Sequence, residues 1–242
     1  MLDNLEAVIG SGAIPKLLDW DSNFFGFPIA SIQLESIKQQ IDPEKLSSQH
    51  LLYLESTFQA TSYIIPGYSC SYQGSKMTFQ AAPKKSSLPC NAILGLELEA
   101  KNQKELLELS LTAGKYSRFN CDPNFSVNQF QALYTRWIKE SLLGNLAEEI
   151  FVVRDANRIV GFATVKIEGG IASVGLIAVH QEYRKQGIAR SLLDSVRDFA
   201  FHRGLSSVFI TTQGENLLAQ ESFFKAGFTF SAQRFIQHYW KI

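Results

Sequence analysis

The chain has 242 residues, of which 45% are hydrophobic and 19% are charged, a composition typical of a globular protein. Its 23 basic residues equal its 23 acidic residues, and this balance argues against nucleic-acid binding, which depends on neutralising phosphates. No apolar run approaches membrane-spanning length, and the first residues lack a basic segment, so we expect neither a membrane anchor nor a signal peptide.

The three cysteines, Cys70, Cys90 and Cys121, are odd in number and widely spaced. This spacing fits neither a disulfide framework nor a zinc site, so we expect free thiols, no bound metal and a reducing cytoplasmic location. The first part of the chain also shows no spacing typical of metal ligands or of a catalytic nucleophile.

Residues 1–114 are predicted to form a small N-terminal α/β domain. Residues 20–27 are dense in aromatic side chains, and we expect them to pack in the core or at a domain interface rather than to form a binding platform. Asp42 and Pro43 resemble the N-cap and first position of a helix over residues 43–58. The other elements expected here are strands at 27–34, 63–65, 76–80 and 93–98 and a helix at 102–112.

Residues 115–242 are predicted to form a second domain. Ser126 suits the N-cap of a long helix that ends at Gly144, and Gly204 suits the end of a later crossover helix. A strand that follows a crossover helix returns parallel to the strand before it. The expected elements are a helix at 125–143, strands at 149–154, 159–167 and 171–179, a helix from 188, a strand at 207–212, a helix at 216–224 and a strand at 228–240.

The turn between the strand at 171–179 and the following helix has the composition of an anion site. Gly187 and Ala189 have small side chains, which let the backbone approach a ligand closely. The first amides of a helix lack helical partners and lie at the positive end of its dipole, so they favour phosphate groups. Arg184, Lys185 and Arg190 add charge around this turn. The pattern predicts a phosphate site, and an ordinary basic loop is the alternative.

Four features in this part of the chain occur in a recognisable order. They are a hairpin strand with Val160-Gly-Phe-Ala, a strand leading to Tyr183-Arg184-x-x-Gly187-x-Ala189, a strand at 208–212, and Asn216-x-x-Ala219-x-x-x-Phe223-x-x-x-Gly227-Phe228. Together they resemble the GCN5-related N-acetyltransferase (GNAT) superfamily. The resemblance implies an α/β (α+β) GNAT fold, with a mixed central sheet and splayed strands, preceded by the smaller α/β domain. It also implies an acetyl-CoA-dependent N-acetyltransferase that acts by direct transfer to a small-molecule amine.

Two shorter segments are similar to the TDP-fucosamine acetyltransferases, which acetylate the amine of a TDP-linked aminosugar. These segments are Trp20-Asp-Ser-Asn-Phe-Phe-Gly26 and Tyr116-Ser-Arg-Phe119. The resemblance implies a sugar nucleotide as the acceptor. The alternatives are another small amine, a peptide N-terminus, or a CoA-binding module without catalysis, and a homodimer is left open.

In the GNAT superfamily the pantetheine arm of acetyl-CoA lies between two splayed strands and satisfies their backbone groups. The resemblance assigns this arm to Leu176, Ile177, Ala178 and Val179, with the amide of Ile177 as the donor to the thioester carbonyl. It assigns the pyrophosphate to Arg184, Lys185, Gln186, Gly187, Ile188, Ala189 and Arg190. Asn216 matches a family residue that contacts the cofactor arm, although it could instead only cap a helix.

One position departs from the family pattern. Phe223 stands where the family has a tyrosine that donates a proton to the leaving thiolate, so we expect Phe223 only to line the cofactor site. Tyr239 is a candidate acid in its place, and water, Ser222 or another group are alternatives. Unassisted departure is also chemically tolerable, because a thiol has a pKa of about 8.5.

Residues for the acceptor amine are less clearly indicated. Arg118 and Asp122 are expected to hold its phosphate or amine, and the alternative is an interdomain salt bridge or a turn. A base is needed because a free amine is mostly protonated at neutral pH. The candidates are a water chain or one of His180, His202, His238, Glu168 and Asp122.

Overall fold

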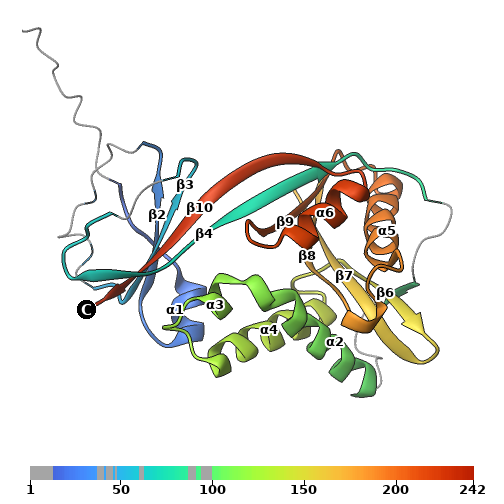
Figure 1. Cartoon of the computed structure of the whole chain (residues 1–242), viewed down its shortest axis with the longest axis horizontal. Helices are drawn as coiled ribbons and strands as arrows, with labels where there is room; N and C mark the ends of the chain where they lie inside the picture. Colours follow the sequence, from blue (N-terminus) through green and yellow to red (C-terminus); the bar gives the residue numbers. More distant parts are fainter. Residues whose placement is uncertain are drawn as a thin grey trace, which may run out of the picture. The chain divides into compact units, whose positions relative to one another are not determined.

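The computed structural model describes residues 13–36, 41, 46, 48–59, 63–86, 91–93 and 100–242. The chain divides into two compact units, one formed by Met1–Ser75 with Arg234–Ile242 and the other by Lys76–Gln233 (Figure 1). The boundary falls within β4 (Tyr68–Ala81) and within β10 (Thr229–Lys241). This division differs from the expected one at residues 114 and 115, because β4 and the strand after it pair with later strands of the second unit.

The first unit is built on the strand order β1-β2-β3-β10. Strand β2 is parallel to β3, whereas β1 and β10 are antiparallel to their neighbours. Aromatic residues 20–27 lie mostly in the short helix α1, where Phe25 is buried and Trp20 is exposed. The bounds are β1 (Lys16–Leu17), α1 (Asp19–Phe25), β2 (Ile29–Leu34) and β3 (Leu51–Ser56).

Two sequence predictions for this unit are wrong. Within the helix expected at 43–58, Leu51–Ser56 form strand β3 instead, whereas residues 43–45 and 47 lie outside the described residues; residues 63–65 form no strand. The first four side chains of β3 are at most 2% exposed, so this strand is covered on both faces. A short apolar run of this kind fits a buried strand as well as a helix, and its periodicity does not separate the two.

The second unit is built on the strand order β4-β9-β8-β7-β6-β5. Strands β8 and β9 are parallel, and the other neighbours are antiparallel. The mixed sheet with its crossover helix confirms the expected fold class. The bounds are β5 (Asn91–Ile93), α2 (Ala100–Ala113), α3 (Arg118–Cys121), α4 (Val127–Leu142), β6 (Glu149–Asp155), β7 (Arg158–Glu168), β8 (Ile171–Val179), α5 (Ile188–His202), β9 (Val208–Gln213) and α6 (Leu217–Lys225).

Helices cover both faces of this sheet (Figure 1). One buried cluster joins Phe151 of β6 to residues of α5 and α6, and the other joins its neighbours Ile150 and Val152 to residues of α2 and α4. Successive strand residues point to opposite faces, so this alternation places α5 and α6 on one side and α2 and α4 on the other. No helix in the described ranges is long and apolar enough to cross a membrane.

Candidate functional site

Strand β8 has an open edge along its second half. It pairs in parallel with β9 only at Ala172, Ser173 and Val174. Beyond Val174, its described pairing is with β7 alone, up to Val179. The two parallel strands therefore separate after Val174, as the expected splay requires.

The direction of the backbone groups along this edge follows from one hydrogen bond. The amide of His180 donates to the carbonyl oxygen of Val160 at 2.8 Å, so these two residues form a hydrogen-bonded antiparallel pair. Bonded and non-bonded pairs alternate along such a ladder. Ala178 is therefore bonded to β7, whereas the N–H and C=O groups of Ile177 and Val179 point to the open edge. This geometry agrees with the donor position inferred for Ile177, whose role stays a prediction.

The turn after β8 leaves the first amides of α5 without helical partners. Gly187 is the N-cap with a φ of 82°, and no side chain caps the helix there. The first helical bond runs from the amide of Ser191 to the carbonyl of Gly187 at 3.0 Å, which leaves the amides of Ile188, Ala189 and Arg190 outside the helical pattern. These amides and the positive end of the helix dipole favour a phosphate group.

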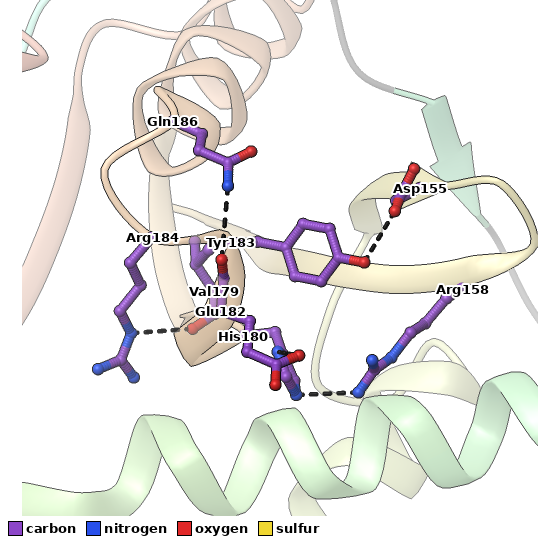
Figure 2. A network of polar contacts seen from close by, with 8 residues as sticks. All are labelled: Asp155, Arg158, Val179, His180, Glu182, Tyr183, Arg184 and Gln186. Carbon is purple, nitrogen blue, oxygen red and sulfur yellow. Dashed lines mark hydrogen bonds and ion pairs between the residues drawn. The ribbon is translucent and has the colours of Figure 1, made fainter.

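The cations predicted around this turn are on the surface. Arg184, Lys185 and Arg190 are all exposed. Arg184 donates from Nε to the carbonyl oxygen of Val179 at 3.2 Å, so it lies beside the end of β8 (Figure 2). Arg190 lies 3.7 Å from Asp194 in the next turn of the helix. The three charges add a positive field to the helix end.

A polar network that the sequence did not indicate anchors this turn to the hairpin between β6 and β7 (Figure 2). Tyr183 donates from its hydroxyl to Oδ2 of Asp155 at 2.8 Å, and Nη2 of Arg158 lies 2.9 Å from Nε2 of His180. An arginine can only donate, so Nε2 of His180 is the acceptor of this contact. Both contacts depend on hairpin geometry, which sequence spacing alone does not reveal.

Asn216 and Phe223 have structural partners. Oδ1 of Asn216 accepts from the amide of Ala219 at 3.3 Å, so this side chain caps α6 as the alternative reading expected. Phe223 is 3% exposed and packs against Phe79 and Phe228, with ring centroids 5.5 and 6.4 Å away. Contacts of either residue with a cofactor stay predictions.

The remaining predicted residues fall in both units. Tyr239 lies in the first unit and is 1% exposed, and its hydroxyl oxygen accepts from the amide of Tyr63 at 2.7 Å. Burial raises the pKa of Tyr239, so its proton is tightly held, and its role as an acid stays a prediction. In the second unit Arg118 is the first residue of α3 and Asp122 is its C-cap, and the amide of Asp122 donates to the carbonyl of Arg118 at 3.0 Å. Asp122 is 1% exposed.

Part of the chain matches a known protein family. Residues 116–228 match the family model described as Acetyltransferase (GNAT) family. The match covers a little less than half of the chain. The matched segment contains the open edge of β8, the turn after it and α5. The expected enzyme class, an N-acetyltransferase, is thereby confirmed.

Solved structures share the fold of this chain. A protein assigned to the GNAT family from Novosphingobium aromaticivorans is 16% identical, with a TM-score of 0.53 over 79% of this chain and 74% of its own. A conserved protein of unknown function from Staphylococcus epidermidis is 13% identical, with a TM-score of 0.57 over 89% and 85%. A tandem GNAT protein from the clavulanic acid biosynthesis pathway is 13% identical, with a TM-score of 0.52 over 89% and 76%. No curated protein matches the sequence.

No group of three or more His, Cys, Asp or Glu residues with the geometry of a metal site occurs in the described parts of the chain. The polar groups described above at the edge of β8 and the start of α5 are backbone amides and surface cations. Such groups bind amides and phosphates.

Proposed function

We propose that this GNAT protein transfers the acetyl group of acetyl-CoA directly to the amine of a nucleotide-linked aminosugar. The observation that carries the cofactor half of this proposal is the open edge of β8, where the amides of Ile177 and Val179 face away from β7. Buried backbone groups without partners are costly, so an edge of this kind favours a ligand with amides of its own.

Two parts of acetyl-CoA suit the residues of the site. The pantetheine arm has two amides that suit the open edge, as an added strand would. The pyrophosphate suits the amides of Ile188, Ala189 and Arg190, and the φ of 82° at Gly187 gives the turn the shape that exposes them. Acetyl-CoA supplies an acyl group held as a thioester, and transfer joins that group to the amine nitrogen and releases the CoA thiol.

The amide of Ile177 is the group that we assign to the thioester carbonyl oxygen. A donor aimed at an oxygen where negative charge develops lowers the barrier by ~3 kcal/mol. The side chains of Ile177 and Val179 pack against the buried cluster under α5 and α6. This packing holds the donor in place, so little reorganisation is needed during the reaction.

The structure gives most candidate bases other partners. Nε2 of His180 faces Arg158 at 2.9 Å, and Nδ1 of His202 lies 3.3 Å from Asp198 at the end of α5. His238 is fully buried in the first unit, and Asp122 accepts a hydrogen bond from the amide of Asn124 at 3.1 Å. We therefore propose that a water chain takes the proton of the amine, and that the thiolate leaves unassisted, with Tyr239 as the alternative acid.

Support for a sugar nucleotide comes from the two segments similar to the TDP-fucosamine acetyltransferases. In the structure these are α1 of the first unit and the residues around α3 of the second. Arg118 and Asp122 are proposed to hold the acceptor, and the guanidinium of Arg118 lies 4.7 Å from the ring of Phe119. We also propose a cytoplasmic location, because Cys70 and Cys121 are free thiols.

Titration calorimetry with acetyl-CoA and a thiol-release assay test the proposal. We expect acetyl-CoA to bind, and thiol release to require a TDP- or UDP-linked aminosugar rather than a simple amine or a peptide. If thiol is released only with a simple amine or a peptide, the acceptor belongs to another substrate class of the GNAT superfamily. Binding without turnover on any amine would favour a CoA-binding module, which the phenylalanine at position 223 also suggests. Failure to bind acetyl-CoA would reject all three readings.

A further inference from the structure

Strand β8 contains a bulge at the point where it leaves β9. On one side of it Val174 is opposite Val165 of β7, and on the other side Ile177 is opposite Ala163. Two residues of β8, Gly175 and Leu176, therefore face the single residue Thr164. This is the two-against-one arrangement of a β-bulge, which bends a strand and is common beside active sites.

The side chain of Thr164 closes this bulge. Its Oγ1 accepts a hydrogen bond from the amide of Leu176 at 2.9 Å, so the hydroxyl takes the place of a ladder carbonyl. Thr164 is 2% exposed, so water does not readily replace it. A Cβ at Gly175 would lie 3.0 Å from the same Oγ1, so a glycine keeps the space that the hydroxyl occupies.

The bulge decides which amide faces the open edge. The amide of Ala172 donates to the carbonyl of Ser207 next to β9, so Ala172 points toward β9, and so does Val174 two residues later. Without the bulge, Leu176 would be the next residue with its N–H toward that edge. With the bulge, Leu176 points to Thr164 and Ile177 takes the outward position.

Side-chain directions also show that the alternation along β8 shifts by one residue at the bulge. Val174 belongs to the buried cluster under α5, whereas Leu176 packs against the cluster under α2 and α4. Residues two apart in a regular strand share a face. Val174 and Leu176 point to opposite faces, so the extra residue lies between them. The bulge therefore reverses the side-chain directions of the rest of the strand as well as one hydrogen bond.

We infer that Thr164 is a positioning residue for acetyl transfer, because its hydroxyl holds the bulge that aims the amide of Ile177 at the thioester carbonyl. This role rests on the proposed function, since it needs a thioester at the open edge. Thr164 touches no reacting atom. It acts through Leu176, and its removal should change turnover more than cofactor binding, because the turn and the N-terminus of α5 stay in place.

The test compares Thr164→Val, which keeps the shape but loses the acceptor, with Thr164→Ser, which keeps the hydroxyl. We expect the valine variant to lose about 10- to 100-fold in kcat, by analogy with the loss of one oxyanion donor. Its Kd for CoA should change less than about 3-fold, because a donor that acts only in the transition state contributes little to cofactor binding. The serine variant should keep kcat within about 2-fold of the native value. If the valine variant does not fold, Thr164→Ala is judged by the same criteria.

Hydrogen exchange on the native chain provides a measurement that needs no variant. The Leu176 amide should be protected without ligand, whereas the Ile177 amide should exchange quickly and become protected when CoA is added. A native kcat in the valine variant, or an Ile177 amide already protected without CoA, would overturn the inference and leave the proposed function intact. A native chain that does not bind acetyl-CoA would overturn both.

Discussion

The hydroxyl of Tyr183 donates a hydrogen bond to Oδ2 of Asp155 at 2.8 Å, and this bond ties the turn before α5 to the hairpin between β6 and β7 (Figure 2). The same hydrogen bond raises the pKa of Tyr183. It anchors the turn to which we assign the CoA pyrophosphate. The contact is exposed, so its effect should be on the position of the turn rather than on overall stability.

Tyr183→Phe is expected to weaken CoA binding a few-fold, because the turn loses one of its anchors, while the free energy of unfolding stays nearly unchanged. Titration calorimetry with CoA measures the affinity. Asp155→Asn should have a smaller effect, because an amide oxygen still accepts from the phenol. If the double variant Tyr183→Phe with Asp155→Asn binds CoA as well as Tyr183→Phe alone, the two residues act as a pair. Independent, additive losses would contradict the anchoring role.

Gly187→Ala should lower both stability and cofactor affinity. The φ of 82° at this position strains any residue with a Cβ, so we expect a loss of about 1–2 kcal/mol in the free energy of unfolding. Gly204→Ala is a matched control, since Gly204 follows the other end of α5 with a φ of 64° and equally open space around it. The two variants should lose similar stability in denaturant titrations. Equal losses of CoA affinity would argue against an anion site at Gly187.

Phe223→Tyr should cost about 1–3 kcal/mol of stability, because it places a hydroxyl in a buried aromatic cluster. We also expect it to raise kcat in the thiol-release assay, because a tyrosine can protonate the leaving thiolate. Phe228→Tyr is the control, since Phe228 is 1% exposed in the same cluster and matches no catalytic position of the family. An unchanged or lower kcat in Phe223→Tyr would show that this position does not face the sulfur.

Glu149→Gln should stabilise the protein at neutral pH but not in acid. Burial raises the pKa of Glu149 above its ordinary value of 4.5, although the amide of Ile150 and the charge of Arg203 partly oppose this shift. The folded state therefore holds the proton longer than the unfolded state, so stability falls as pH rises between the two pKa values. The gain in free energy of unfolding from Glu149→Gln should be absent at a pH below the ordinary pKa. It should be complete at a pH above the raised pKa of the folded state.

Denaturant unfolding at several pH values measures this difference. Glu221→Gln is a control of opposite sign, since hydrogen bonding to Lys225 lowers the pKa of the exposed Glu221. Its carboxylate contributes stability that is present above the ordinary pKa and lost as pH falls through the lowered one. An advantage of Glu149→Gln that is equally large in acid would show that the carboxyl is not the cause.

Local patterns in the sequence predicted the elements of the site well. Strand β8 spans Ile171–Val179, as its apolar run indicated, and α5 begins at Ile188 directly after the Gly187 N-cap. Ser126 caps α4, and its side chain and that of Gln129 form the reciprocal hydrogen bonds of a capping box. These features depend on a few neighbouring residues, so composition and spacing are enough to find them.

Features that depend on strand pairing could not be found in the same way. The bulge opposite Thr164 needs the register of β7 against β8, and nothing within either strand determines it. The division of the chain also differed from expectation, because β4 pairs with β9 and β5 with β6, far along the sequence. A glycine at position 175 within a strand was the one local signal of a bulge.

The pairing of β4 with β9 has a consequence for how the protein is made. The hydroxyls of Thr78 and Thr211 meet at 3.0 Å across these strands, although 133 residues separate them. At the usual speed of translation, β4 leaves the ribosome on the order of ten seconds before β9 exists. During that interval this long strand must stay soluble without its partner, so expression of the protein should respond to chaperone supply and to a lower growth temperature.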